Sequence, residues 1–262
     1  MDTPTGKLAV VTGASSGIGY ELAKCCAREN FDLIVCAEDA ALEKAAADFR
    51  SMGCNTEAVR ADLASQAGVA QLWKAIAGRS VDLLCANAGK GLGKGFLDQE
   101  LDQVQNLIDL NIGGTISLIH KVGRQMRDDG SGRILITGSI AGQIPGSFQA
   151  VYNGSKAFLD SFSFALGNEL RESGVTVTCL MPGPTDTDFF REAGLEDTRV
   201  GAGKKQDPKE VAQAAFAAAM NGEASVVPGF MNKVQSVFAD LLPDTTLAEM
   251  HRRMAKPGTA DK

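Results

Sequence analysis

The chain has 262 residues, of which 44% are hydrophobic and 22% charged, values typical of a folded protein with a full core rather than a disordered or fibrous one. Its 26 Lys and Arg against 32 Asp and Glu give a formal net charge of -6, so the basic excess that nucleic-acid binding needs is missing. Neither a membrane-spanning apolar run nor a basic signal-peptide head is evident, and we therefore expect no membrane association and a cytoplasmic location.

Seven short apolar runs alternate with longer segments of helical periodicity. The expected strands are residues 7–12, 31–37, 56–61, 81–86, 133–137, 175–180 and 224–227, and the expected helices begin near Gly17, Asp39, Ser65, Asp98, Asn111, Val151 and Pro208. The strand runs show little apolar-polar alternation, which is typical of strands buried on both faces. The pattern predicts a single-domain α/β fold, a Rossmann-like doubly wound parallel seven-stranded sheet. Ser65 and Asp207 are expected helix N-caps.

The first strand runs directly into the turn T-G-A-S-S-G-I-G at residues 12–19, and a helical pattern follows from Tyr20. Glycines permit a tight turn and a close approach to a pyrophosphate, whose charge is stabilised by exposed N–H groups and the positive end of the helix dipole. Such turns also serve as plain packing joints. The position in the first β-α unit favours a phosphate site.

The six cysteines and two histidines form no recognisable metal or disulfide pattern. There is no C-x-x-C pair, and His120 and His251 lie far apart, so we expect no metal site. Cys36, Cys85 and Cys179 fall in short apolar runs. A thiol in such a run behaves as a small hydrophobe, which predicts a role in core packing.

Ser139 follows the run at residues 133–137. In open parallel sheets, the carboxyl ends of the strands border the ligand crevice. A hydroxyl at this place could hold a carbonyl oxygen as charge develops on it. Taken singly, a serine here is equally well explained as a turn residue or a helix cap.

Tyr152 and Lys156 stand four residues apart in a helical segment, so their side chains share one face. A free phenol has a pKa near 10, and a nearby cation favours the phenolate, which brings the group into range for proton exchange. The alternative is a solvated lysine beside a half-buried tyrosine. The chain has only one other tyrosine, Tyr20.

Together these features resemble the short-chain dehydrogenase/reductase family over nearly the whole chain. The family's glycine motif resembles residues 12–19, and its N-A-G element resembles residues 87–89. Its catalytic asparagine, serine and Y-x-x-x-K pair resemble Asn111, Ser139, Tyr152 and Lys156, and its P-G element with the following threonine resembles residues 182–187. The motifs occur in the family's order and at its spacing.

The resemblance implies reversible hydride transfer between a nicotinamide and a carbonyl or alcohol carbon of a small molecule. Tyr152 would exchange the proton, Lys156 would lower the phenol pKa and hold the nicotinamide ribose, and Ser139 would orient the carbonyl. Asn111 would interrupt its helix and fix a water. Gly154, where the family more often has alanine, would permit close helix packing. A catalytically silent NAD(P)-binding sensor on the same fold is the alternative function, and an epimerase fits the chain length and glycine spacing less well.

The resemblance also implies a set of cofactor-binding residues, most of them in the segments that follow the strands. They are Gly13, Ser15, Ser16, Gly17, Ile18, Gly19, Glu38, Asp62, Leu63, Asn87, Ala88, Gly89, Tyr152, Lys156, Pro182, Gly183, Thr185 and Thr187. An acidic residue where the second strand ends, here Glu38, can bond the ribose hydroxyls of NAD and would repel the 2′-phosphate of NADP, so NAD(H) is favoured over NADP(H). The alternative is that Glu38 and Asp39 only cap the helix that follows.

Residues 185–206 combine glycines and mixed charges with the apolar pair Phe189 and Phe190. This composition indicates a mobile excursion with one short helix that could close as a lid, the two phenylalanines forming either a substrate surface or a small local core. Ile140, Gln143 and Ile144 would line the same pocket.

Residues 1–229 are expected to form the dinucleotide-binding catalytic domain, and 230–262 a helical extension with a frayed end at 257–262. The mixed charge of the extension argues against a membrane-surface helix and favours a packing role, as a subunit clamp or a cover for the pocket.

The helices around 111–127 and 151–171 would pair in a homodimer or homotetramer. The second of them carries more apolar surface than packing on one sheet face requires, from Phe158, Phe162, Phe164 and Leu166.

Overall fold

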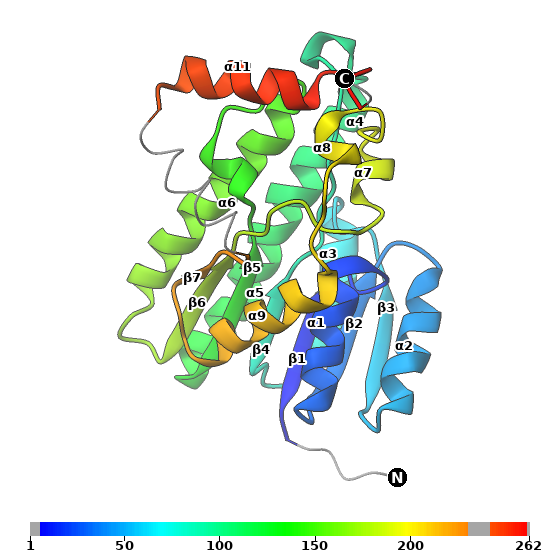
Figure 1. Ribbon diagram of the computed structural model, residues 1–262. Coiled ribbons are helices and arrows are strands. Elements are labelled where there is room, and N and C mark those ends of the chain that lie inside the picture. The colour runs from blue at the N-terminus through cyan, green and yellow to red at the C-terminus, as the bar shows by residue number, and fades with distance from the viewer. Residues whose placement is uncertain (1–5, 230–241, 261–262) are drawn as a thin grey trace.

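The computed structural model describes residues 6–229 and 242–260 (Figure 1). Seven strands form one parallel sheet in the order β3-β2-β1-β4-β5-β6-β7. Their bounds are β1 Leu8–Thr12, β2 Asp32–Ala37, β3 Thr56–Arg60, β4 Leu83–Ala86, β5 Gly132–Thr137, β6 Val175–Leu180 and β7 Ser225–Val226. The strand order reverses between β1 and β4, which is the switch point where such sheets open a ligand crevice. The predicted doubly wound α/β fold is confirmed.

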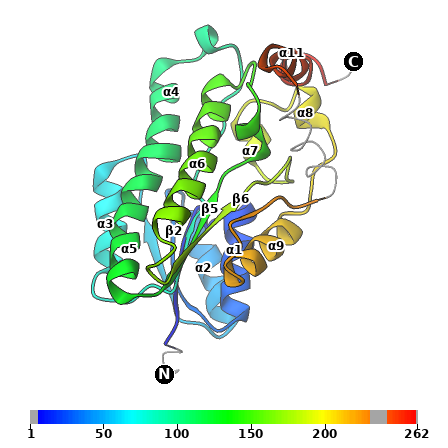
Figure 2. The same cartoon turned by 90° about the vertical axis from the view of Figure 1, so that its left-hand side faces the viewer.

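Helices cover both faces of the sheet (Figure 2). One layer contains α1 (Gly17–Arg28), α2 (Ala41–Ser51) and α9 (Pro208–Met220), and the other contains α3 (Gln66–Ile76), α4 (Leu101–Ile108), α5 (Thr115–Asp129) and α6 (Ala150–Glu169). Neighbouring strand residues feed opposite layers: Val11 packs in the cluster with α1, and Val10 in the cluster with α3 and α5. Because both faces are buried, the strands read as unbroken apolar runs.

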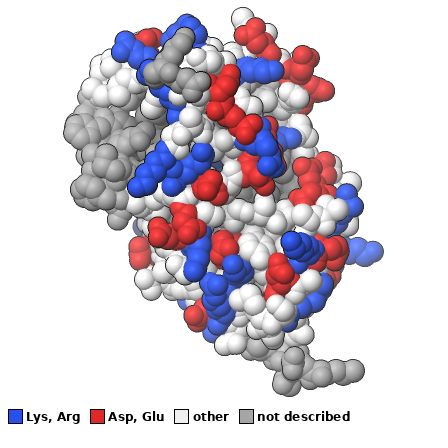
Figure 3. All heavy atoms as spheres, turned by 45° about the vertical axis from the view of Figure 1, so that its right-hand side comes forward, with Lys and Arg blue, Asp and Glu red and all other residues white. Residues whose placement is uncertain are grey.

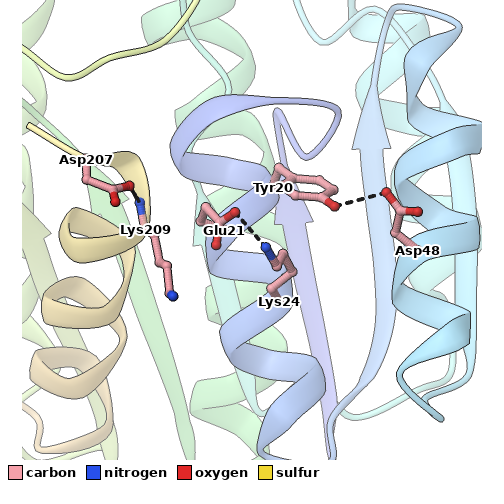
Figure 4. A network of polar contacts seen from close by, with 6 residues as sticks. All are labelled: Tyr20, Glu21, Lys24, Asp48, Asp207 and Lys209. Carbon is pink, nitrogen blue, oxygen red and sulfur yellow. Dashed lines mark hydrogen bonds and ion pairs between the residues drawn. The ribbon is translucent and has the colours of Figure 1, made fainter.

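Local signals placed several helix starts correctly. Ser65 Oγ accepts a hydrogen bond of 3.0 Å from the Gly68 N–H and caps α3. Asp207 Oδ1 accepts one of 2.8 Å from the Lys209 N–H at the start of α9 (Figure 4). A cap of this kind contributes about 1 kcal/mol. Both predicted N-caps are confirmed.

Tyr20 has a structural role between α1 and α2 (Figure 4). Its hydroxyl donates a 2.9 Å hydrogen bond to Asp48 Oδ2, and the Lys24 ammonium lies 5.0 Å from its ring centroid while bonding Glu21 at 2.8 Å. Burial, followed by the bond to Asp48, raises the pKa of this phenol. Tyr20 therefore ties two helices together and stands apart from the tyrosine that carries the chemistry suggested by the sequence.

The six cysteines are buried without forming disulfides, which confirms the packing role expected for Cys36, Cys85 and Cys179. The described residues contain no group of side chains able to hold a metal ion. None of the helices in the described ranges is long and apolar enough to cross a bilayer. On the face seen in Figure 3, acidic and basic side chains are interspersed.

The segment at 185–206 contains two short helices, α7 (Phe189–Glu192) and α8 (Arg199–Ala202), rather than one. A bridge between Thr185 and Gln206 closes its base. Beyond it, α11 (Asp244–Ala255) lies across the top of the molecule beside α8 (Figure 1). Part of the predicted extension, residues 230–241, lies outside the described residues.

The expectation of a frayed end at residues 257–262 is wrong for the part that is described. The Gly258 N–H donates to Asp197 Oδ2 at 3.1 Å, and the Thr259 and Ala260 N–H groups donate to the Asp197 carbonyl at 2.9 and 3.0 Å. These bonds join the end of the chain to the segment between α7 and α8. Composition near a terminus does not reveal such a distant acceptor.

Candidate active site

A cavity of about 680 Å³ opens where the strands end. Its walls come from the loops after β1 to β6, from the segment at 185–206 and from α11. Of the predicted cofactor-binding residues, all but Gly19 line this cavity. Ile140 and Ile144 line it as expected, whereas Gln143 does not, because its amide turns away and contacts Met181 Sδ at 3.5 Å.

The glycine turn fits a diphosphate group. Gly13 and Gly17 have φ values of +65° and +56°, in the left-handed region that L side chains rarely adopt. Ser16 precedes α1 in an extended conformation without a side-chain cap, so the first amides of the helix are left to an external acceptor. Gly19 lies underneath, where a Cβ would collide with the Gly13 carbonyl oxygen. Its role is to let the turn close.

Glu38 and Asp39 line the cavity at the end of β2. Both carboxylate oxygens of Asp39 are used locally: Oδ2 accepts from Ser15 Oγ at 2.7 Å and Oδ1 from the Ala41 N–H at 2.9 Å. Asp39 therefore fixes the turn before α2. Glu38 has an exposed side chain, and its backbone carbonyl accepts a 2.9 Å bond from Arg60 Nε. Of the two acids, Glu38 is the one with a carboxylate available to a ligand.

Asn87 joins the ends of three strands. Its Nδ2 donates to the Thr12 carbonyl at 3.1 Å, its Oδ1 accepts from Thr137 Oγ1 at 3.0 Å, and its N–H donates to Thr12 Oγ1 at 3.0 Å. The Ala88 N–H shares the same threonine hydroxyl. These bonds set the position of the loop after β4 in the cavity wall.

Tyr152 and Lys156 lie on α6 and converge with Ser139, which follows β5. Lys156 Nζ donates a 2.7 Å bond to the Thr137 carbonyl and lies 5.9 Å from the Tyr152 ring centroid. Burial raises the pKa of Tyr152 to about 12, opposed by its hydrogen bond with Ser139. Burial lowers the pKa of Lys156 to about 8. The lowering of the phenol pKa that was expected from Lys156 is not found, because burial raises this pKa.

Asn111 lies behind the cavity wall and does not line it. The six residues Asp109–Gly114 form a π-helical turn between α4 and α5, so the implied interruption of the helix is present. Asn111 Oδ1 accepts from the Lys90 N–H at 2.9 Å, while its Nδ2 donates to the Lys90 carbonyl at 2.9 Å and to Ser155 Oγ at 3.1 Å. Its side chain holds the loop after β4 against α6.

Asp160 is a buried carboxylate that the sequence reading missed. Its Oδ1 accepts from the Ser139 N–H at 3.3 Å and from Cys179 Sγ at 3.5 Å, while no group in the described part of the chain bonds its Oδ2. Burial raises its pKa to about 6. Its position one helical turn after Lys156 was the signal available in the sequence, because residues four apart share a face.

The outer end of the cavity is aromatic. The Phe189 ring lies 5.1 Å from that of Tyr152 and 5.4 Å from that of Phe190, measured between centroids. His251 and Met254 of α11 complete this wall, and neither was among the predicted site residues. An apolar surface therefore lies beside the Tyr152 ring in the same cavity.

Comparisons with known proteins agree with this geometry. The family model for short chain dehydrogenases matches residues 7–198. An uncharacterized oxidoreductase of Staphylococcus saprophyticus is 34% identical, covering 80% of this chain and 89% of its own length. The 3-oxoacyl-acyl-carrier-protein reductase of Salmonella typhimurium is 31% identical, with 86% and 93% covered. A short-chain dehydrogenase from Sphingobium yanoikuyae, solved in complex with NADPH, superposes with a TM-score of 0.81 at 29% identity, covering 90% of this chain and 93% of that one.

Proposed function

The chain belongs to the short-chain dehydrogenase family, and on that premise we propose that it transfers a hydride between a nicotinamide dinucleotide and a carbonyl or alcohol carbon of a small molecule, with Tyr152 exchanging the proton. It is an oxidoreductase that acts on CH–OH or C=O groups. The observation that carries the proposal is the convergence of Tyr152, Ser139 and Lys156 on one cavity whose other end is the uncapped first turn of α1.

The bound nicotinamide would supply or take up the hydride. Tyr152 donates the proton to the carbonyl oxygen in the reductive direction, and a phenol with a pKa of about 12 is fully protonated at neutral pH, as that step requires. Ser139 orients the oxygen by hydrogen bonding. Lys156 is within reach of the same face of the cavity, and its ammonium supports the phenolate that forms. The amides of α1 and the residues around Gly13 hold the diphosphate.

We propose NAD(H) as the preferred cofactor. Glu38 presents an exposed side chain at the end of β2, where the adenosine ribose would lie, and the further negative charge of a 2′-phosphate would be repelled there. The positive charge of Arg60, which is bonded to the Glu38 backbone, favours NADP(H) instead. The Sphingobium relative was also solved with NADPH. Parallel titration with NADH and NADPH decides between them.

The decisive test of the function is turnover of a panel of ketones and alcohols with the tighter-binding cofactor, for the natural chain and for Tyr152→Phe. Removing a general acid costs about 100-fold to 10,000-fold, whereas the affinity for NADH should stay within about tenfold, because the phenol moves a proton rather than holding the dinucleotide. Tyr20→Phe is the matched control and should keep full turnover, since Tyr20 contacts Asp48 away from the cavity. Cofactor binding without turnover in the natural chain would instead indicate a nucleotide sensor.

We also propose that the chain assembles as a homodimer or homotetramer through α5 and α6. Phe158 and Phe164 on α6 are 40% and 47% exposed, although Phe162 and Leu166 of the same helix pack on the core. Large aromatic side chains left in water are characteristic of surfaces that associate. The family match does not itself supply the number of subunits.

A further inference from the structure

α11 supplies part of the wall of the cavity from outside the stretch that the family model matches. Its inward stripe consists of Leu247, His251 and Ala255, and His251 is 5% exposed. His251 and Met254 line the cavity, whereas the family match ends at residue 198. The family match therefore does not cover this histidine.

The hydrogen bond of His251 identifies its tautomer. Nδ1 lies 2.8 Å from the Ser147 carbonyl oxygen, and because a carbonyl can only accept, the proton sits on Nδ1. Burial lowers the pKa of the imidazole, opposed by this bond, so the ring is neutral at physiological pH. In a neutral ring protonated at Nδ1, Nε2 carries a lone pair and accepts. Within the described ranges, no side chain or backbone group donates to it.

The ring is also fixed in orientation. Ser147 Oγ donates back to the Ala248 carbonyl at 2.9 Å, and the Arg252 guanidinium lies 5.3 Å from the Phe148 ring centroid. Phe148 has a φ of +65°, an unfavourable conformation that the contacts from α11 hold in place. This loop leads into α6 and Tyr152, so α11 and the proton-exchanging residue share one rigid support.

The surroundings of His251 define the character of the ligand. Phe189, Phe190, Val200 and Met254 make that end of the cavity apolar, and Asp188 and Glu192 add carboxylates at its edge. The cations in the described lining, Lys90 and Lys156, come from the loop after β4 and from α6. Asp188 is paired with Arg191 at 2.8 Å, so the character of this wall is set mainly by its apolar side chains, which fit a neutral and largely apolar molecule.

We propose that His251 is a substrate-binding residue whose Nε2 accepts a hydrogen bond from a hydroxyl group, so that the substrate is a neutral, mainly apolar ketone or alcohol with a second hydroxyl remote from the reacting carbon. The inference rests on the proposed function and narrows its substrate class. The substrate would be an apolar molecule with a polar group at each end. Tyr152 and Ser139 would bind the reacting oxygen, and His251 would bind the second hydroxyl.

The tautomer is testable by nitrogen NMR of the full chain without any turnover. Only two histidines give signals, and His120→Asn, which removes an exposed residue of α5, assigns them. We expect His251 to be protonated at Nδ1 at pH 7 and to titrate below the usual range of a histidine side chain. A ring protonated at Nε2, or an imidazolium at pH 7, would overturn the proposal.

The substrate assignment is tested with pairs of cyclic and linear ketones of six to twelve carbons, each beside its analogue with a remote hydroxyl. The natural chain should favour the hydroxylated member of the best pair by about tenfold or more in kcat/KM, mainly through KM. His251→Asn keeps a donor near the Nδ1 position and removes the Nε2 acceptor, so the preference should vanish. His251→Gln keeps an acceptor near the Nε2 position and should retain part of it.

His120→Asn serves as the control and should keep the full preference. Turnover of ketones with an equal preference in the natural chain and His251→Asn would overturn the assignment while leaving the proposed function intact. No reduction of any ketone by the natural chain with either cofactor would instead contradict the proposed function, and the substrate class would fall with it.

Discussion

Asp160 shows how one buried carboxylate is tied to the residues of the candidate site. It sits one turn beyond Lys156 on α6 and accepts from the Ser139 N–H. Gly138 and Gly142 leave room for it, because a Cβ at either position would collide with its carboxylate oxygens. The carboxylate therefore holds the loop that presents Ser139, although burial of the acid is unfavourable, since one of its oxygens bonds to none of the described residues.

That cost should appear as a pH dependence of stability. Burial raises the pKa of Asp160 from 3.8 to about 6 in the folded state, so between these values the folded chain binds more protons than the unfolded one. Its stability therefore falls as pH rises through this window, by roughly 1–3 kcal/mol. Asp160→Asn, which can still accept from the Ser139 N–H, should gain stability relative to the natural chain by that amount between pH 4 and pH 7.

Urea unfolding of both proteins at several pH values measures the difference. A gap in the free energy of unfolding that does not change from pH 4 to pH 7 would show that Asp160 does not titrate in this window. Ser163→Ala, one turn further along the same helix, is a suitable comparison, since it removes a hydroxyl that bonds the Leu159 carbonyl without adding or removing a charge.

Glu38 decides the cofactor if its carboxylate faces the ribose. Glu38→Gln removes the repulsion of a 2′-phosphate and weakens the bonds to ribose hydroxyls, so the ratio of NADH to NADPH affinity should fall by about tenfold, which corresponds to about 1.4 kcal/mol. Titration of both cofactors measures the ratio. Glu43→Gln, at an exposed acid in the first turn of α2, should leave this ratio unchanged. An unaltered ratio in Glu38→Gln would show that Glu38 shapes the loop and does not select the cofactor.

At the scale of elements, Gly154 in α6 is a weak point with no packing reason. The close packing expected there is absent, because no described atom lies within 4 Å of a Cβ built at this residue. Gly154→Ala should raise the free energy of unfolding by roughly 0.5–1 kcal/mol through helix propensity.

Gly142→Ala is the contrasting variant. A Cβ at Gly142 would run into Asp160 Oδ2 and the Ala157 backbone, so the same chemical change should destabilise the chain. Urea unfolding of the two variants should therefore give shifts of opposite sign. A loss of stability in Gly154→Ala would indicate an unrecognised neighbour of that helix face, such as a second subunit.

Elements governed by local rules could be predicted from the sequence. Apolar runs predicted the strands, and Ser65 and Asp207 predicted helix starts, because strand burial and capping depend on a few neighbouring residues. The site residues within motifs could be predicted because each motif is also a short local pattern. A motif does not distinguish a residue that faces a ligand from one that supports it, however, and Gly19 and Asn111 proved to lie behind the cavity wall.

Features that depend on distant docking could not be predicted. His251 meets Ser147 across 104 residues, and Asp197 meets Gly258 across 61. Both contacts depend on the position at which α11 packs against the rest of the chain, and no local sequence pattern predicts that position. A histidine in an apolar helical stripe with Leu247 and Ala255 was the available hint, and such a residue is as compatible with plain core packing as with a cavity wall.

At the scale of the whole molecule, the exposed aromatic surface of α6 calls for an explanation. Phe158 stacks on Phe162 with centroids 5.9 Å apart and is 40% exposed, and Phe164 is 47% exposed. These side chains belong to the helix that carries Tyr152 and Lys156. Association through α6 would therefore stiffen the helix on which proton exchange depends.

Light scattering after size exclusion should give the mass of two or four chains. Replacing both exposed rings, Phe158→Ser with Phe164→Ser, should shift the mass towards one chain at micromolar concentration, because burying each ring contributes roughly 1–2 kcal/mol to association. Met52→Ser, at the end of α2 in the opposite layer and 36% exposed, should not change the mass. A natural chain that runs as one subunit at every concentration would remove the subunit interface from α6 and leave the two phenylalanines as a surface for another partner.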